Sequence, residues 1–241
     1  MAIDQQRITT IIFDYGNTLI EFGRDLITDE RRTFERVLSG MFGHCDAERV
    51  NHIRDRQIIA PYHNGYREND LREITAELIR EVYGHEPKDD HVDRLIDERH
   101  RWFVETVTLP DDVGPLLERL GERYRMALLS NFPNGQSIRE SLERLNLTRF
   151  FETVVVSADV GLVKPHRKPF DTLLNRIGAS PGECVMVGDN WLADIQGSKN
   201  LGMQAVHTTQ YVPYENFESY DNDHQPDATI HTFAELEALL A

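Results

Sequence analysis

The sequence predicts an α/β protein whose parallel sheet is interrupted, after its first strand, by a helical insertion. Three observations support this fold class. From residue 111 onward, apolar runs of strand length alternate with amphipathic segments of helix length, a pattern typical of a parallel sheet with crossover helices. One earlier apolar run, Ile11 to Phe13, has the composition of a first strand. The stretch between them, roughly residues 22 to 106, is long and charged and contains no convincing strand.

The alternating region can be divided into its elements in order. The expected helices are Val113 to Glu122, Gln136 to Leu145, Lys168 to Ile177 and Ala193 to Leu201, and the expected strands are Tyr124 to Leu129, Thr153 to Val156, Cys184 to Val187 and Gln204 to His207. Gly178 and Gly202 follow two of these helices, where glycine commonly ends a helix. A last strand and helix finish the chain. Thr232 and Glu235 have the spacing of a capping box, so the helix is expected to start after Thr232.

The insertion contains enough helical sequence for a small bundle. Its four candidate helices are Asp29 to Met41, Asp46 to Ile59, Asp70 to Tyr83 and His91 to Val107. Because it directly follows the first strand, we expect it to lie over the carboxyl ends of the strands, where it can close a site and select substrates. The predicted domains are a core of residues 1–20 and 107–241 and a helical cap of residues 21–106.

Composition narrows the class of protein. The chain has 241 residues and a formal net charge of −15, which disfavours nucleic acid and anionic membranes because both are bound mainly through Lys and Arg. The longest apolar runs have the length of strands, and the N-terminus lacks an apolar signal core. Cys45 and Cys184 are expected to be reduced thiols. We therefore expect a cytoplasmic protein without nucleic-acid or membrane partners, and the sequence leaves monomer or homodimer open.

A candidate nucleophile stands where the first strand is expected to end. Asp14 directly follows Ile11 to Phe13, and Gly16 comes two positions later. Asp and Gly are also favoured in turns for backbone reasons, so this stretch alone does not distinguish a turn from a functional site. Ligands of open α/β sheets bind outside the carboxyl ends of the strands. The predicted topology therefore puts Asp14 where a substrate would bind.

Three later strand ends carry groups that complement this carboxylate. Ser130 and Asn131 offer a hydroxyl, a side-chain amide and backbone N–H groups that suit a phosphate oxygen. Lys164 lies in the loop after the next strand, and Asp189 and Asp194 follow the one after that. Each residue alone has an ordinary structural explanation, as a turn, a cap or a solvated charge. A parallel sheet would bring all of them to one edge, which favours a functional site.

The chemistry of this set is coherent. Asp14 and Asp189 supply hard oxygen ligands suited to Mg²⁺, which is commonly bound by one or two carboxylates and a substrate phosphate. Lys164 would offset the charge of the crowded carboxylates and of the phosphate. Together with the metal it would keep Asp14 ionised and nucleophilic.

The four ordered motifs resemble those of the haloacid dehalogenase-like hydrolase superfamily. They are Asp14 to Thr18, Ser130-Asn131, Lys164-Pro165, and Gly188-Asp189 with Asp194. The resemblance implies a Rossmann-like three-layer core with an inserted four-helix cap of the C1 type. It further implies a Mg²⁺-dependent phosphatase-like hydrolase that transfers phosphate from a small phosphorylated metabolite to Asp14, forming an aspartyl-phosphate intermediate that water hydrolyses.

The resemblance also assigns roles to individual residues. It gives catalytic roles to Asp14, Ser130 and Lys164, substrate or phosphate binding to Gly16, Asn17, Ser130, Asn131 and Lys164, and Mg²⁺ binding to Asp14, the Gly16 carbonyl, Asp189 and Asp194. In this scheme Asp14 is the nucleophile and Lys164 neutralises charge between it and the phosphate. Asp194 supports the metal directly or through its neighbours.

One position departs from the family pattern. Phosphatases of this family usually carry a second Asp two residues after the nucleophile, where this chain has Gly16. That acid protonates the leaving oxygen, and general acid–base help is typically worth about 10²–10⁴ in rate. Solvent, the substrate or a cap residue could supply the proton instead. Candidate cap residues are His44, His63 and Glu21.

Other readings of the same motifs stay open. A 2-haloacid dehalogenase needs no acid to expel halide, so Gly16 permits that activity, although the paired acids resemble the Mg²⁺-dependent branch. A catalytically degenerate member would only bind a ligand or a protein partner. The phosphonate-cleaving branch is disfavoured because it needs a cap amine, and Lys88 is the only lysine between residues 20 and 110. A sugar-phosphate mutase is the least favoured reading, because it needs proton transfer at the position that Gly16 occupies.

Overall fold

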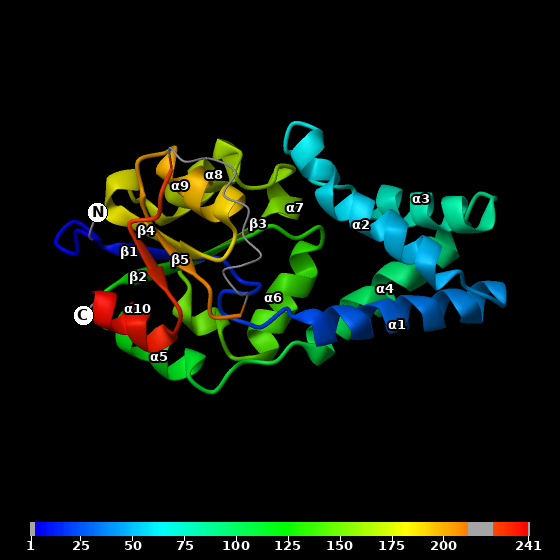
Figure 1. Ribbon diagram of the computed structural model, residues 1–241, viewed down its shortest axis with the longest axis horizontal. Helices are drawn as coiled ribbons and strands as arrows, with labels where there is room; N and C mark the ends of the chain where they lie inside the picture. Colours follow the sequence, from blue (N-terminus) through cyan, green and yellow to red (C-terminus); the bar gives the residue numbers. More distant parts are fainter. Residues whose placement is uncertain (1–2, 212–223, 241) are drawn as a thin grey trace.

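The computed structural model of the protein describes residues 3–211 and 224–240. Within these residues, parallel strands form one six-stranded sheet in the order β3-β2-β1-β4-β5-β6 (Figure 1). The strands are β1 (Thr10–Phe13), β2 (Arg125–Ser130), β3 (Thr153–Val156), β4 (Cys184–Gly188), β5 (Gln204–Thr208) and β6 (Ala228–Ile230). Later strands extend from β1 in both directions, so the direction of winding reverses there. Such a switch point is where open α/β sheets bind ligands.

Helices cover both faces of this sheet. They are α5 (Val113–Gly121), α6 (Gly135–Arg144), α7 (Ser157–Val160), α8 (Arg167–Ile177), α9 (Gly197–Lys199) and α10 (Phe233–Leu240), with single turns η1 (Thr148–Phe150), η2 (Pro181–Glu183) and η3 (Trp191–Gln196). Successive strand residues point to opposite faces. Ile11 and Phe13 share an apolar cluster with α5 and α10, whereas Ile12 packs with α8 on the other face (Figure 1). The three-layer α/β core is confirmed.

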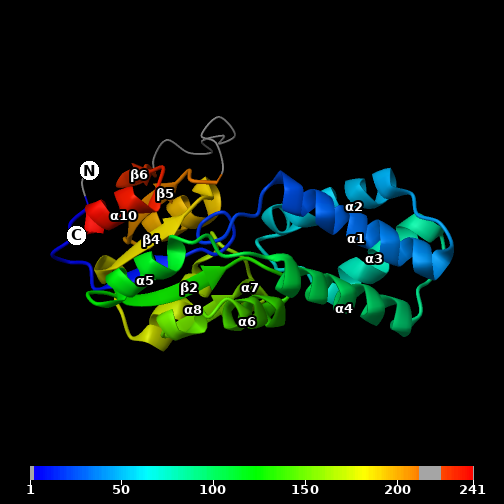
Figure 2. The same ribbon diagram turned by 90° about the horizontal axis from the view of Figure 1, so that it is seen from below.

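The helical insertion between β1 and β2 is also confirmed. Its helices are α1 (Arg24–Phe42), α2 (Ala47–His63), α3 (Leu71–Tyr83) and α4 (Asp89–Thr106). They bury a core of their own, which includes Leu38, Ile53, Ile79 and Leu95, one from each helix. Figure 2 shows this cap at one end of the sheet. The domain division at residues 20–21 and 106–107 stays a prediction.

The segment after β4 differs from its predicted form. The sequence favours an α-helix from Ala193 to Leu201, but residues Trp191–Gln196 form a π-helical turn and only Gly197–Lys199 continues as α-helix. The Asn190 side chain accepts a hydrogen bond from the Ala193 N–H (2.9 Å) at its start. Single π-helical turns are frequent at functional sites. Here the turn carries Asp194.

Two predicted helix ends are confirmed, whereas Gly202 does not end a helix because α9 already stops at Lys199. Gly178 ends α8 at φ 66°, and its N–H donates to the Leu174 carbonyl. The final helix begins after Thr232, whose hydroxyl accepts from the Glu235 N–H at 3.3 Å. Cys45 and Cys184 are free. In residues 3–211 and 224–240, every helix is too short or too polar to cross a membrane.

Candidate active site

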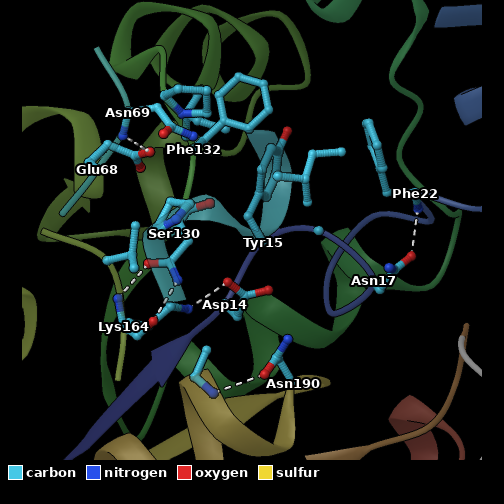
Figure 3. A pocket seen from close by; sticks show the side chains of 18 of the residues that line it. Asp14, Tyr15, Asn17, Phe22, Glu68, Asn69, Ser130, Phe132, Lys164 and Asn190 are labelled. Atoms are coloured by element: carbon cyan, nitrogen blue, oxygen red, sulfur yellow. Dashed lines mark hydrogen bonds and ion pairs between the residues drawn. The ribbon is translucent and has the colours of Figure 1, made fainter. Parts of the chain in front are cut away.

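A cavity of about 410 Å³ lies between the strand ends of the core and the inner side of the cap. All eight residues to which the four motifs assigned roles line it: Asp14, Gly16, Asn17, Ser130, Asn131, Lys164, Asp189 and Asp194. Figure 3 shows several of them pointing toward one another from separate elements. The parallel sheet brings them together because it aligns the carboxyl ends of β1, β2 and β4 at one edge. Their catalytic roles stay predictions.

Lys164 is the centre of the polar contacts in this cavity. Its buried ammonium lies 2.7 Å from Asp14 Oδ1, 2.6 Å from Asp194 Oδ1 and 2.7 Å from the Leu129 carbonyl oxygen. Burial alone would lower the pKa of Lys164, but the charges of Asp14 and Asp194 outweigh it and raise that pKa. The lysine is therefore a permanent cation between two carboxylates.

Three carboxylates crowd together beside this ammonium. Asp14, Asp189 and Asp194 each offer a carboxylate oxygen, and these atoms all lie within 4.8 Å of one another. Burial, followed by the charges of Asp14 and Asp194, raises the pKa of Asp189 well above its ordinary value. Burial likewise raises the pKa of Asp194 to about 6. One ammonium does not neutralise three carboxylates, so the cluster has a surplus of negative charge that suits a cation.

The donor set fits Mg²⁺ better than a softer metal. All donors are oxygens, and Mg²⁺ prefers a small number of carboxylates and keeps several waters. Both Asp194 oxygens already have partners, Lys164 at 2.6 Å and the Asn190 N–H at 3.0 Å. Asp189 has no side-chain hydrogen bond to another described residue. Asp14 and Asp189 are therefore the carboxylates best able to hold the ion, with Asp194 fixing the lysine and the loop.

The carbonyl of Asp189 is held from behind by a buried histidine. His207 Nε2 lies 3.0 Å from this oxygen, and because a carbonyl only accepts, Nε2 carries the proton. Burial lowers the pKa of His207 and keeps the ring neutral. Trp191 packs edge-on against this ring with centroids 5.4 Å apart and does not line the cavity. Sequence inspection missed His207, because only the β4–β5 pairing brings it beneath Asp189.

The Asn131 side chain binds the backbone of Lys164, whereas the sequence suggested that its amide would bind a phosphate oxygen. Its Oδ1 accepts from the Lys164 N–H at 2.8 Å, and its Nδ2 donates to the Lys164 carbonyl at 3.0 Å. The side chain therefore fixes the lysine backbone, and any contact with phosphate falls to other groups. Ser130, by contrast, is buried at the cavity wall, and its hydroxyl has no hydrogen bond to any residue in 3–211 or 224–240. That hydroxyl is available to a ligand.

The turn after Asp14 is stabilised by Asn17. Asn17 has φ 54°, a left-handed conformation that asparagine tolerates, and its Oδ1 accepts from the Phe22 N–H at 2.8 Å (Figure 3). Gly16 beside it has no such constraint. A Cβ at position 16 would contact only the Phe22 Cβ, at an ordinary 3.9 Å. Packing therefore does not require glycine where the family's second Asp usually stands.

The cap supplies residues that the sequence did not single out. Those lining the cavity include Glu30, Arg54, Gln57, Glu68, Asn69 and Arg99. The proposed proton donors His44, His63 and Glu21 are exposed and do not line it, so those suggestions were wrong. Helical periodicity indicates that a cap helix has an inner face, but it does not say which polar side chains face the strand ends.

Tyr62 reaches the core from the end of α2. Asn131 Nδ2 lies 3.4 Å from the Tyr62 hydroxyl oxygen. Burial raises the pKa of Tyr62. Because it is neutral and accepts from Asn131, its own O–H remains able to donate into the cavity. Tyr62 is the first residue of the stretch Tyr62 to Arg67, whose polar and aromatic composition is compatible with a specificity loop.

Comparison with known proteins agrees with this geometry. Residues 11–208 match the family model described as haloacid dehalogenase-like hydrolase. The pyrophosphatase PpaX of Halalkalibacterium halodurans is 28% identical over 232 residues, with 95% of each chain covered. The glyceraldehyde 3-phosphate phosphatase of Pyrococcus furiosus is 30% identical over 207 residues, covering 83% of this chain and 80% of the relative.

Solved structures share the fold at lower identity. The HAD-hydrolase YfnB from Bacillus subtilis, in a form bound to magnesium, superimposes with a TM-score of 0.71 at 20% identity and covers 97% of this chain and 99% of its own. A 2-haloacid dehalogenase from Pseudomonas syringae gives 0.73 at 21% identity, with 97% and 98% covered. With the family model spanning the core, the cap and all four motifs, the chain belongs to the haloacid dehalogenase-like hydrolase family.

Proposed function

We propose that this hydrolase is a Mg²⁺-dependent phosphatase that removes phosphate from a small phosphorylated metabolite through Asp14. The observation that carries the proposal is the contact of one buried ammonium, Lys164, with both Asp14 and Asp194 beside the half-buried Asp189. A structural salt bridge would balance the charges, whereas this cluster keeps an excess of carboxylate at the cavity wall. That excess suits a divalent cation and, through it, a phosphate.

The reaction needs two displacements at phosphorus. In the first, an oxygen of Asp14 attacks, an aspartyl phosphate forms and the bond to the leaving oxygen breaks. In the second, water attacks the phosphorus and releases phosphate and the free carboxylate. Lys164 puts its positive charge beside Asp14 and the incoming phosphate in the first step, and the Ser130 hydroxyl would bind a phosphoryl oxygen. Mg²⁺, held by Asp14, Asp189 and the Gly16 carbonyl, would neutralise charge on the phosphoryl group.

The relatives support the substrate class. Those named above are called a pyrophosphatase and a glyceraldehyde 3-phosphate phosphatase, and both names describe removal of phosphate from a small compound. The cavity of about 410 Å³ is in the range of about 300–1,000 Å³ typical of small-molecule sites.

Because Gly16 cannot donate a proton, the rate of hydrolysis should depend strongly on the leaving group. Without an acid at that position, the leaving oxygen takes its proton from solvent, the substrate or the cap. Of the described carboxylates lining the cavity outside the Asp cluster, Glu30 is paired with arginine and Glu68 is not. Burial raises the pKa of Glu68, which makes it the better proton donor of the two. We therefore expect rates to fall steeply as the pKa of the leaving alcohol rises.

The proposal is tested by assaying phosphate esters and 2-haloacids with Mg²⁺ and with chelator, in wild type and Asp14→Asn. Phosphate release that needs Mg²⁺ and disappears in the variant supports it. Halide release in the presence of chelator would instead identify a dehalogenase. Ligand binding without turnover of any compound would identify a non-catalytic member of the family.

A further inference from the structure

The cap side of the cavity carries a buried cluster of two arginines and one glutamate. Glu30 Oε1 of α1 lies 2.8 Å from Arg54 Nη2 of α2 and 3.1 Å from Arg99 Nε of α4. All three residues line the same cavity as Asp14. The Arg54 side chain is 9% exposed, and that of Arg99 is 19% exposed. Three separate cap helices therefore deliver these charges to one place.

The cluster of Glu30, Arg54 and Arg99 has a net positive charge and N–H groups that are not used in hydrogen bonds to described residues. Two guanidinium groups face one carboxylate, and burial does not neutralise an arginine because its pKa is so high. Each guanidinium has five N–H groups, and each makes a single hydrogen bond or ion-pair contact within the described part of the chain, with Glu30. The remaining N–H groups of a nine-tenths buried Arg54 are thus unpaired beside a cavity.

Aromatic rings fix the position of both guanidinium groups. The Arg54 guanidinium carbon lies 4.0 Å from the centroid of the Phe34 ring, and that of Arg99 lies 5.5 Å from the Phe132 ring. Phe132 follows Asn131 directly, so Arg99 also joins the cap to the phosphate end of the core. Stacked, paired arginines lose little entropy on binding a planar or tetrahedral anion.

One further carboxylate faces this end of the cavity. Glu68 accepts hydrogen bonds from the Ser157 hydroxyl and from the Asn69 N–H (Figure 3) and has no ion pair with either arginine. Arg99 acts on Glu68 only through its charge. The arginine donors are therefore not used by Glu68, although its negative charge would weaken an anion bound there.

We propose that Arg54 and Arg99 bind a second anionic group of the substrate, a carboxylate or a second phosphate. The inference rests on the proposed function, in which the first phosphate binds at Asp14, Lys164 and Ser130. Apolar side chains also line this cavity, among them Phe22, Ile58, Phe103, Phe132 and Val163. The substrate class is accordingly a phosphate monoester with a short carbon chain and a distal anion.

Matched substrate pairs test this proposal. 3-Phospho-D-glycerate and sn-glycerol 1-phosphate each release a primary alcohol, have the same spatial arrangement at C2, and differ in a carboxylate against a hydroxymethyl group. 1,3-Propanediol bisphosphate and 3-hydroxypropyl phosphate test a second phosphate in the same way. In at least one pair, kcat/KM for wild type should favour the member with the second anionic group by about tenfold or more, as expected of a charge-assisted contact. A ratio near one in both pairs overturns the proposal.

Variants then locate the selectivity. Arg54→Met and Arg99→Met should each lower the ratio about tenfold, and Arg54→Lys should retain more of it than Arg54→Met. Arg56→Met is the matched control, because Arg56 lies on the same helix but is exposed and paired with Glu81. Its ratio should equal that of wild type. Ratios in the Arg54 and Arg99 variants that equal the Arg56 ratio would contradict the proposal.

Two further measurements keep the test independent of folding and of turnover. If thermal unfolding shows that Arg54→Met is not folded, Glu68→Gln decides instead. Removing the charge of Glu68 should raise the ratio of kcat/KM values within a substrate pair, and an unchanged or lower ratio counts against the site. Calorimetry on Asp14→Asn should give tighter binding of 3-phospho-D-glycerate than of sn-glycerol 1-phosphate. Mg²⁺-dependent hydrolysis of p-nitrophenyl phosphate by wild type tests the proposed function separately.

Discussion

The ammonium of Lys164 lies 2.7 Å from a carboxylate oxygen of Asp14, although the two residues are 150 positions apart in the chain. The same ammonium contacts Asp194 at 2.6 Å, so one buried cation joins the end of β1 to the π-helical turn after β4. A buried charge without a partner is strongly destabilising, so each of these groups depends on the others. Four predictions follow from contacts around this centre and in the cap.

Lys164→Met should lower kcat by roughly 10²-fold or more, because Asp14 and Asp194 lose their shared cation and the incoming phosphate meets uncompensated carboxylates. The measurement is Mg²⁺-dependent hydrolysis of p-nitrophenyl phosphate. Lys168→Met is the control, since Lys168 is exposed and its ammonium donates to the Val160 carbonyl at 3.2 Å, away from the carboxylate cluster. Near-normal kcat in Lys164→Met would show that the ammonium is structural.

Asn131→Ala should reduce kcat about tenfold by releasing the Lys164 backbone from two hydrogen bonds, with a loss of stability of about 1–3 kcal/mol. Because Asn131 acts through the lysine, the double variant with Lys164→Met should be no slower than Lys164→Met alone. Additive losses would show that Asn131 contacts the substrate directly.

Gly16→Asp should accelerate hydrolysis of phosphates with poor leaving groups, by as much as roughly 10²-fold, because it adds a proton donor where the backbone and packing admit a side chain. A series of aryl and alkyl phosphates measures this as a shallower dependence of rate on leaving-group pKa. Gly16→Asn has a similar shape without the proton and should give no acceleration. An unchanged slope in Gly16→Asp means that another group already supplies the proton.

Glu30→Gln should destabilise the protein at pH 7 and much less in acid. Burial alone would raise the pKa of Glu30, but the charges of Arg99 and Arg54 outweigh it and lower that pKa. The folded state therefore favours the carboxylate, and its contribution is complete above the pKa of the unfolded chain, near about 4.3. That contribution is lost as the pH falls through the lower folded pKa.

Denaturant unfolding of wild type and Glu30→Gln between pH 3 and pH 7 measures this dependence. We expect a difference of about 1–3 kcal/mol at pH 7, the range for a buried polar group that loses a charged partner. The difference should shrink below pH 4. A difference independent of pH would indicate that the substitution acts through packing.

The motif residues could be predicted because their placement depends on short-range patterns. An apolar run followed by Asp14, Ser130 or Asp189 marks the carboxyl end of a strand, and parallel strands put such ends at one edge. The sheet order only had to be parallel for these residues to meet. The same argument explains why the helical cap was predictable: four amphipathic segments without strand character have few other ways to bury their apolar faces.

Contacts that depend on which way a side chain turns were not predictable. Asn131 could have contacted phosphate, but tertiary packing places the Lys164 backbone beside its amide. Asp194 was expected on an α-helix and lies instead on a π-helical turn. No local pattern specifies such choices, because the competing backbone hydrogen bonds differ little in energy and distant neighbours settle the balance.

Local patterning of strands, turns and helices was thus sufficient for the α/β class, the inserted cap and the order of the strand-end residues. Only the tertiary structure shows three further features. Glu30 pairs with both Arg54 and Arg99. His44 and His63 lie outside the cavity, and His207 lies beneath Asp189. Periodicity reports which face of an element is apolar. The polar side chains that share a cavity are decided by packing between elements far apart in sequence, where desolvation and charge pairing act together.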